Sequence, residues 1–204
     1  MQPLPMSRAM TPADWANLDE DEPGELVDGW LEEEEMPTAL HEAVVAWLLW
    51  ILQSHVAPRG GRAFGSELKL IVAARRGRKA DVSVYLRGRP LPGKARGATR
   101  RPPSIVVEVL SPRPRDVRRD VVAKKADYAA FGVSYYWIVD PIARVVEVFD
   151  LGADGRYAVA LSASDGRHAT PGCDGLELDL DAMWANADAL PDDEPEEDPG
   201  VPDL

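Results

Sequence analysis

One acidic residue stands inside a strongly apolar segment, and it is the clearest candidate for chemistry in this sequence. Glu108 interrupts the run Ile105-Val106-Val107-Glu108-Val109-Leu110, which Ser111 and Pro112 follow. A short run rich in β-branched residues predicts a strand that is covered on both faces. An ionised carboxylate in that position is costly unless a cation or hydrogen-bond donors compensate it. Glu108 therefore needs a partner from elsewhere in the chain.

A second acid and a lysine could belong to the same site. Asp81 opens a strand-like run that ends at Leu86, although an acid at a strand start is usually a surface or turn residue. Farther along, Asp120, Lys124 and Tyr128 follow each other at intervals of four residues, which places them along one face of a helix. A surface ion pair between Asp120 and Lys124, worth about 0.3–0.5 kcal/mol, is the plainer interpretation of this spacing.

The elements around Glu108 give these residues a reason to meet. The strand of Glu108 is followed by a helix predicted over residues 116–131, which Gly132 ends, and then by a second buried strand over 134–139. Because the helix follows the first strand after a short loop, its first turns can lie over the carboxyl end of that strand. Lys124 would then face Glu108.

The remaining segments predict a mixture of strands and helices. A long apolar helix is expected over residues 39–56, and His41 lies in its first turn, where a histidine is more often capping or structural than catalytic. Glu67 interrupts the apolar pattern of a strand expected over 63–72. The other expected elements are a helix over 11–18, a hairpin over 25–32 with an Asp28-Gly29 turn, a basic turn over 75–79, a strand over 80–86, a meander over 144–149 and 156–161, and a strand-to-helix segment over 176–184.

Length and composition suit one domain with tails. We expect a helical lead-in over residues 1–24, a domain over 25–186 and an acidic, proline-rich, disordered tail over 187–204. The single cysteine, Cys173, excludes a disulfide within the chain and a cysteine-based zinc site. No signal peptide and no membrane span is recognised, so we expect a cytoplasmic protein without a membrane partner.

The charge is unevenly distributed along the chain. The net charge of -12 argues against a nucleic-acid partner, but residues 59–125 hold 19 of the 23 Lys and Arg and only five of the 35 Asp and Glu. A loop over 87–103 is rich in Arg, Pro and Gly, and a connection this long is commonly functional or disordered. An ordinary solvated, arginine-rich surface is the alternative to a phosphate-contacting flap. The basic residues of the loop are Arg87, Arg89, Lys94, Arg96, Arg100 and Arg101.

Several strings of the sequence resemble the bacterial Uma2 family, which is grouped with the PD-(D/E)XK restriction-endonuclease-like superfamily. They are Ala80-Asp81-Val82, Glu108-Val109-Leu110-Ser111-Pro112, Asp120 with Lys124 and Tyr128, and the run from Gly132 to Pro141. Glu25 to Gly29 and His41 also fit the family pattern. The resemblance spans residues 26–184 and implies an α/β (α+β) fold, in which a central mixed β-sheet is flanked by helices.

The resemblance also implies roles for single residues. Asp81 matches the first acid of the family and Glu108 the second, and Ala80 stands where the superfamily has proline. The superfamily lysine normally stands two residues after the second acid, where this chain has Leu110, and Lys124 takes its place on the next helix. Asp81, Glu108 and the backbone oxygen of Val109 would hold Mg²⁺ or Mn²⁺. Supporting roles fall to Asp120, Tyr128 and His41. Glu67, on the neighbouring predicted strand, is a candidate for a further acid or outer-shell group.

The function implied by this resemblance is metal-dependent hydrolysis of DNA phosphodiester bonds. Two carboxylates can hold Mg²⁺ through hard oxygen ligands, the ion acidifies bound water, and an ammonium beside that water can orient it or offset developing charge. The alternative is a catalytically inactive nuclease-like fold that serves as a binding or assembly module. A hydrolase of RNA or of a smaller phosphoester is a third hypothesis. The apolar helix over 39–56, with Trp47 and Trp50, would suit the interface of a homodimer.

Overall fold

A six-stranded mixed β-sheet forms the centre of the computed structural model, which describes residues 9–18, 24–32, 36–94, 97–111 and 117–191. The strand order is β11-β10-β9-β8-β6-β3. Strands β8 and β9 are parallel, and all other neighbours in this sheet are antiparallel. The strands are β3 (Arg62–Phe64), β6 (Val82–Tyr85), β8 (Ile105–Val109), β9 (Tyr135–Asp140), β10 (Val145–Leu151) and β11 (Tyr157–Ala163).

The parallel pair β8 and β9 is connected by the helix α3 (Val117–Phe131), because parallel neighbours need a crossover connection. Gly132 ends the helix with a positive φ of 89°. All five residues of β8 are buried, Glu108 included. The strand–helix–strand unit expected from the sequence is therefore confirmed, and the antiparallel meander of β9, β10 and β11 is confirmed with it.

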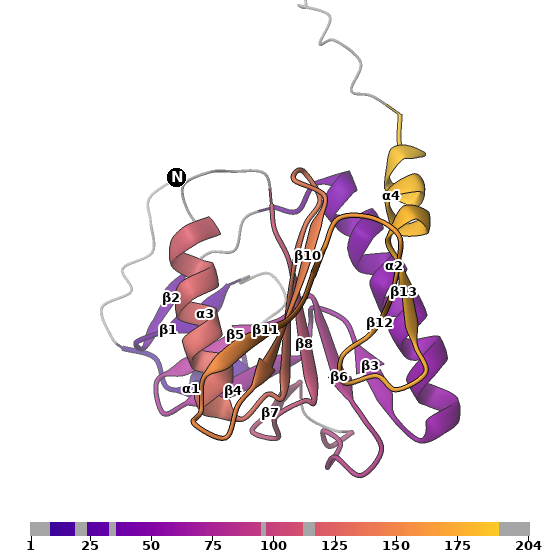
Figure 1. Ribbon diagram of the computed structural model, residues 1–204. Coiled ribbons are helices and arrows are strands. Elements are labelled where there is room, and N and C mark those ends of the chain that lie inside the picture. Colours follow the sequence, from indigo (N-terminus) through magenta and orange to yellow (C-terminus); the bar gives the residue numbers. More distant parts are fainter. Residues whose placement is uncertain (1–8, 19–23, 33–35, 95–96, 112–116, 192–204) are drawn as a thin grey trace, which may run out of the picture.

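Helices cover both faces of this sheet (Figure 1). On one face lie α2 (Ala39–Val56), the short 3₁₀ helix η1 (Ala57–Arg59) and α4 (Leu180–Asp188), and α3 lies on the other. Side chains alternate along β8, so Val107 packs into the core beneath α2 while Val106 packs with Tyr128 of α3. Glu108 has the same parity as Val106 and therefore faces α3.

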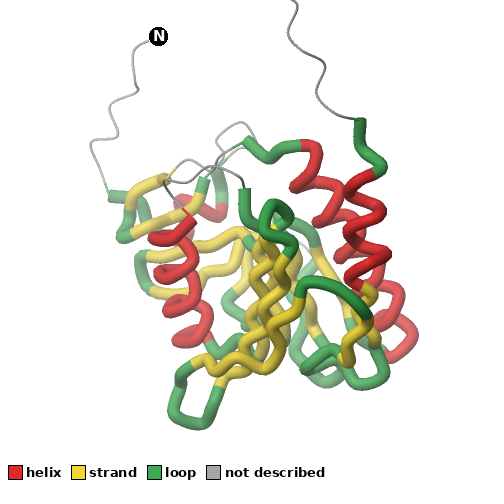
Figure 2. Tube along the Cα trace, turned by 45° about the horizontal axis from the view of Figure 1, so that its top comes forward, coloured by secondary structure: helices red, strands yellow, loops and turns green. Residues whose placement is uncertain are grey.

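A smaller five-stranded sheet, of order β2-β1-β5-β4-β7, lies on the α3 side of the molecule (Figure 2). The predicted hairpin is confirmed, since Asp28 and Gly29 have φ values of 51° and 89° between β1 and β2. The helix α1 (Pro12–Ala16) buries Trp15 against Gly77 of this sheet. The strands are β1 (Glu25–Val27), β2 (Trp30–Glu32), β4 (Lys69–Ala73), β5 (Arg76–Lys79) and β7 (Ala98–Thr99); a separate pair, β12 (Arg167–Ala169) and β13 (Glu177–Asp179), precedes α4.

Two expectations about this region were wrong. The single strand expected over 63–72 is divided by a turn in which the Leu68 amide donates to the Gly65 carbonyl, and its halves, β3 and β4, belong to different sheets. The expected basic turn over 75–79 contains the strand β5, which pairs with both β1 and β4. Its sequence, Arg-Gly-Arg-Lys, has no large apolar side chain; buried carboxylates pair with Arg78, and the ring of Trp15 packs against Gly77.

The helix α2 tests the expectation that no segment of the chain is long and apolar enough to span a membrane. Within the described residues, Ala39–Arg59 is long and apolar enough to do so by length and composition, contrary to that expectation. The core helix of a soluble protein can have the same length and composition, and Val44, Leu48, Leu52 and Val56 of α2 lie in the core. Trp50 is exposed on the opposite side of the helix.

Candidate active site

Two acids meet at one end of the central sheet because β6 and β8 are antiparallel. Val82 pairs with Val107, so continuing the register by one step places Asp81 opposite Glu108 on the same face. The Asp81 carboxylate is fixed there, since Oδ2 accepts a hydrogen bond of 2.7 Å from the backbone N–H of Val109. Two residues that are 27 positions apart in the sequence thus present their carboxylates side by side.

Glu108 is 6% exposed, and two side chains of α3 satisfy its carboxylate. The ammonium Nζ of Lys124 lies 3.0 Å from Oε2, and the hydroxyl of Tyr128 donates to Oε1 at 2.6 Å. Because Lys124 and Tyr128 are one helical turn apart, both point at the same strand end. The buried acid that needed a partner has a cation and a hydrogen-bond donor.

Glu25, on β1, is a third carboxylate of this cluster, and sequence reasoning missed it. Its Oε1 lies 3.4 Å from Nζ of Lys124 and accepts a hydrogen bond of 2.9 Å from the backbone N–H of Lys79. Its Oε2 accepts from Arg78 at 2.7 Å. The sequence shows a glutamate followed by Leu26-Val27 at the start of a hairpin, in a segment that fits the family pattern. That pattern does not say which helix the strand will face.

A buried ionic network holds Glu25 in place. Arg78 donates from both Nε and Nη2 to Oδ2 of Asp127, at 2.9 and 2.7 Å, while its third nitrogen binds Glu25. Arg76 donates to the other oxygen of Asp127 at 2.7 Å. Since Asp127 lies on α3 and both arginines lie on β5, the network ties the second sheet to the helix that carries Lys124.

His41 approaches the site from the first turn of α2. Its Nε2 lies 3.4 Å from Oδ2 of Asp81, and the side chain is buried. Burial by itself lowers the pKa of His41, but Asp81 and, to a smaller extent, Glu42 together more than reverse this, so the pKa lies above its ordinary value. Nδ1 lies 3.4 Å from Glu42 but makes no hydrogen bond within the described residues. A protonated His41 therefore adds positive charge beside Asp81.

Glu108, Asp81 and Glu25 lie around the ammonium of Lys124. The pKa of Glu108 is raised to about 7: burial makes the largest contribution to the rise and Asp81 and Glu25 add to it, while Lys124 and Tyr128 oppose it. Burial lowers the pKa of Lys124, but Glu108 and Glu25 raise it by more. The pKa of Lys124 therefore lies above its ordinary value. We conclude that Lys124 stays protonated and that Glu108, which is buried and lies close to Asp81 and Glu25, is the group that takes up a proton.

The donor set suits a hard divalent cation. Asp81 and Glu108 offer carboxylate oxygens from adjacent strand ends, and a carboxylate oxygen that accepts one hydrogen bond keeps a further lone pair. Burial raises the pKa of Glu108 most, and the charges of Asp81 and Glu25 add to the rise; a divalent cation would offset these effects by favouring the ionised carboxylate. Within the described residues no group of three or more His, Cys, Asp or Glu side chains is arranged to hold a metal. Mg²⁺ needs only one or two carboxylates, because it keeps several waters.

Among the other residues that the sequence suggested, those that the structure describes lie outside this cluster. Glu67 is exposed and lies 3.3 Å from Nζ of Lys79. The side chain of Asp120 and all of Arg96 fall outside the described residues. The basic loop joins the end of β6 to the start of β8, whereas Asp81 and Glu108 lie at the opposite ends of these strands. Antiparallel pairing therefore separates the cluster from Arg87, Arg89, Lys94, Arg100 and Arg101.

A mixed sheet whose strand–helix–strand unit brings two acids and a lysine to one end defines a nuclease fold of the restriction-endonuclease type. The model of the Uma2 family, described as "Putative restriction endonuclease", matches residues 13–185, and the chain belongs to this family.

The comparison with solved structures agrees on the fold. A crystal structure of a "putative nuclease belonging to DUF820" from Anabaena variabilis is similar, with a TM-score of 0.71. The two chains are 20% identical, and the match covers 87% of this chain and 99% of that one. A search of curated proteins found no significant match.

Proposed function

We propose that this protein is a metal-dependent endonuclease that hydrolyses DNA phosphodiester bonds at the cluster of Asp81, Glu108 and Lys124. One observation carries the proposal. Nζ of Lys124 lies 3.0 Å from Glu108, although the lysine stands 16 residues beyond that acid in the sequence. This distance supports the proposal that the lysine on the helix takes the place that the superfamily gives to a lysine of the strand.

Asp81, Glu108 and the backbone oxygen of Val109 would hold Mg²⁺ or Mn²⁺. When bound there, the ion supplies polarisation of the phosphate and acidity of the attacking water. Lys124 reaches the same strand end, so its ammonium can donate to the water or to a phosphoryl oxygen as negative charge develops. Tyr128 holds the second oxygen of Glu108, which keeps that carboxylate in a single orientation.

Two further groups position the reacting residues. Glu25 holds the Lys124 ammonium together with Glu108, and the Arg78–Asp127 network holds Glu25. His41 lies beside Asp81 and can limit the rotation of its carboxylate. Each is a positioning residue in this scheme, because it acts on a side chain of the site.

Plasmid nicking tests the proposal directly. Purified protein is incubated with supercoiled plasmid in Mg²⁺ or Mn²⁺, beside the variants Asp81→Ala, Glu108→Ala and Lys124→Ala. Loss of Lys124 should slow nicking by about 10²–10³-fold, the usual effect of removing one donor to developing charge. Lys125→Ala is the matched control, because Lys125 stands next on the same helix but stacks over the ring of Phe149. Its nicking rate should match that of the wild type.

The outcomes separate the competing hypotheses. If the wild type nicks no faster than the three variants, the enzymatic proposal is wrong, and an inactive nuclease-like binding or assembly module is favoured. Nicking that survives all three substitutions would come from a contaminant. A matching series with RNA decides between DNA and RNA as substrate.

The family description supports a nucleic-acid substrate. We also propose that the protein forms a homodimer and is cytoplasmic. The exposed Trp50 on α2 is the feature that a dimer would cover. Sedimentation of the wild type across a range of concentrations tests the homodimer.

A further inference from the structure

The end of the central sheet opposite to the acids carries exposed cations without ion-pair partners. Among the residues that the structure describes, these cations form no ion pair with a carboxylate, although the chain has 35 acids for 23 Lys and Arg. By contrast, Arg76, Arg78, Lys124, Arg144 and Arg167 are paired, whereas the exposed Arg75, within the described residues, binds only the backbone oxygen of Asp28. In so acidic a protein, a group of cations that stays apart from carboxylates points to an external anion. The unpaired, exposed cations at this end include Arg59, Arg62, Arg87, Lys94, Arg100 and Arg101.

A pocket of about 210 Å³ opens at this end. The end of α2 and the helix η1 contribute His55 and Arg59, the segment after β6 contributes Arg87, and the loop before β13 contributes Cys173 and Asp174. Two guanidinium groups and an imidazole thus face a single carboxylate. Guanidinium groups are the side chains best suited to bind phosphate oxygens, because they donate two parallel hydrogen bonds.

The pocket is partly organised before a ligand arrives. Nη1 of Arg59 donates to the backbone oxygen of His55 at 2.7 Å, which directs the guanidinium and leaves its other N–H groups free. Gly60, with a φ of 85°, ends η1 and turns the chain beside Arg87. Less side-chain entropy is therefore lost when an anion binds.

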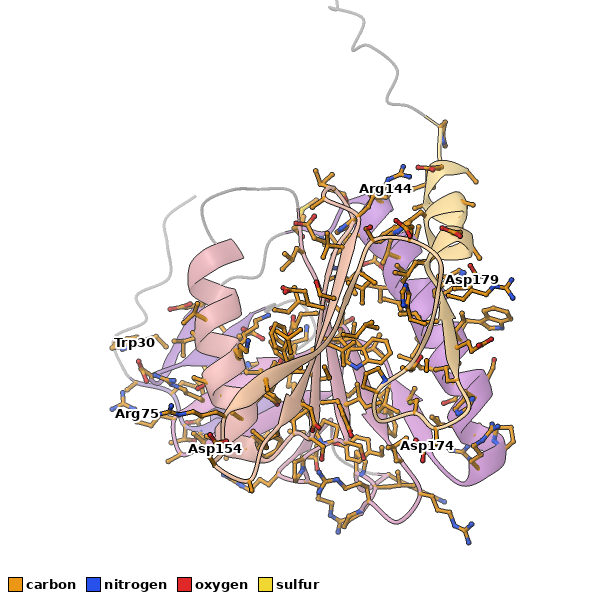
Figure 3. All side chains as sticks on the ribbon, in the orientation of Figure 1. Trp30, Arg75, Arg144, Asp154, Asp174 and Asp179 are labelled. Atoms are coloured by element: carbon orange, nitrogen blue, oxygen red, sulfur yellow. The ribbon has the colours of Figure 1, made fainter. Side chains whose placement is uncertain are left out.

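This pocket is separate from the candidate active site. Figure 3 shows Asp174 of the pocket at the end of the molecule opposite to Arg144, which lies in the turn after β9. Because β9 is parallel to β8, that turn lies at the same sheet end as Glu108. A strand of four to five residues at about 3.3 Å per residue separates the two ends, so the pocket and the acids must contact different stretches of a polyanion.

We propose that the His55–Arg59–Arg87 pocket is a second nucleic-acid contact, in which the two arginines hold a backbone phosphate of a segment other than the one at the acids. The choice of nucleic acid as the polyanion rests on the proposed function, but binding at the pocket needs neither metal nor hydrolysis. The neighbouring unpaired cations extend the contact along the backbone.

Binding of a fluorescently labelled DNA duplex, followed by anisotropy in EDTA at several salt concentrations, tests this inference. The double variant Arg59→Gln/Arg87→Gln should bind about tenfold more weakly at low salt. The slope of log affinity against log salt should fall in magnitude by about 2, because each missing arginine leaves its phosphate charge unneutralised. Arg167→Gln is the matched control, because it removes one exposed arginine that is paired with Asp179 away from the pocket. Its slope should match that of the wild type.

A variant with the opposite expected effect guards against misfolding as an explanation. Asp174→Asn removes the one carboxylate that lines the pocket and should tighten duplex binding, which a damaged fold would not do. Unchanged affinity and slope in the double variant would overturn the proposal, and so would weaker binding by Asp174→Asn.

Two further arms identify the ligand and separate this inference from the proposed function. Calorimetry with inorganic phosphate and with a mononucleotide tests whether the pocket binds a small ligand. If one of these ligands binds the wild type but not the double variant, and DNA duplex does not compete with it, nucleic acid is not the ligand. Asp81→Asn, in which the candidate catalytic acid is neutral, should bind duplex in EDTA at least as tightly as the wild type. If the wild type fails to nick plasmid but its binding depends on Arg59 and Arg87, the proposed function fails and the second contact stands.

Discussion

At the scale of single residues, the position of the lysine depends on two carboxylates rather than one. Lys124 lies 3.0 Å from Glu108 and 3.4 Å from Glu25, so its ammonium has a fixed place between a strand of each sheet. Two carboxylates that hold one ammonium restrict the rotamers of the Lys124 side chain.

Glu25→Gln tests this positioning role. The substitution keeps the shape of the side chain but removes a charge beside Lys124, so nicking should slow by about 10–100-fold, as is usual when a supporting partner is lost. The pKa of Lys124 should fall, and the alkaline limb of the pH–rate profile should move to lower pH. Glu67→Gln, the same change at an exposed glutamate, is the control. A wild-type rate and an unshifted profile for Glu25→Gln would show that Glu25 has no part in positioning the lysine.

The buried Glu108 makes stability depend on pH in a defined direction. Its pKa of about 7 in the folded protein lies above the ordinary value of 4.5 that the unfolded chain would have. Between these two values the unfolded chain releases the proton while the folded protein keeps it. The protonated Glu108 therefore contributes fully to the free energy of unfolding below about pH 4.5, and this contribution is lost as the pH rises through 7.

Glu108→Gln removes this titration. In EDTA, the melting temperature of the variant minus that of the wild type should increase as the pH rises from 5 to 8. The increase should be on the order of several degrees. Melts of both proteins at each pH measure the difference, and Glu67→Gln shows whether any glutamate would behave in the same way. A difference that stays constant with pH would contradict the raised pKa.

At the scale of elements, the loop before β13 shows how one backbone position can determine local packing. Gly172 and Gly175 share a φ of 78°, which side chains rarely adopt. A Cβ at Gly172 would overlap the ring of Tyr135 on β9, whereas a Cβ at Gly175 would meet no atom within 4 Å. The two glycines therefore separate the cost of backbone strain from the cost of a steric overlap.

Gly172→Ala should lower the free energy of unfolding by about 1–3 kcal/mol more than Gly175→Ala, because only the first substitution overfills its surroundings. Chemical denaturation of both variants measures the difference. Equal losses would mean that Tyr135 moves aside freely. Because Gly172 also lines the His55–Arg59–Arg87 pocket, the Gly172→Ala variant should also bind DNA duplex more weakly.

At the scale of the whole molecule, the net charge of -12 conceals two different ends. One end of the central sheet gathers Glu25, Asp81 and Glu108 around Lys124, and the other displays unpaired arginines. The first end would attract a divalent cation and the second a phosphate backbone. A binding measurement that changes only the salt concentration reports mainly on the second end.

Metal binding should raise the stability of the whole chain by mass action. At a metal concentration one hundred times the dissociation constant, the gain is about 2.7 kcal/mol, which is seen as a higher melting temperature in Mg²⁺ or Mn²⁺ than in EDTA. Asp81→Asn should lose the shift, whereas Glu67→Gln should keep it. The absence of a shift in the wild type at millimolar metal would favour the binding-module hypothesis.

The sequence by itself determined the features that depend on local pattern. The apolar run around Glu108 indicated a buried strand, and the spacing of Lys124 and Tyr128 placed them on one helix face. The Asp28-Gly29 turn set the register of its hairpin. In each case, residues within one element or one tight turn carry the information, because strand and helix periods decide which side chains share a face.

Only the tertiary structure decided which elements meet. It brought Glu25 to Lys124, placed His41 beside Asp81 and made a strand of the basic segment Arg76–Lys79. It also sent the basic loop to the end of the sheet away from the acids. Strand direction and the pairing of the two sheets arise from contacts between residues far apart in the sequence. The spacing of apolar residues within one element does not reveal such contacts. Buried ion pairs such as Arg78 with Glu25 and Asp127 leave no apolar signal at all.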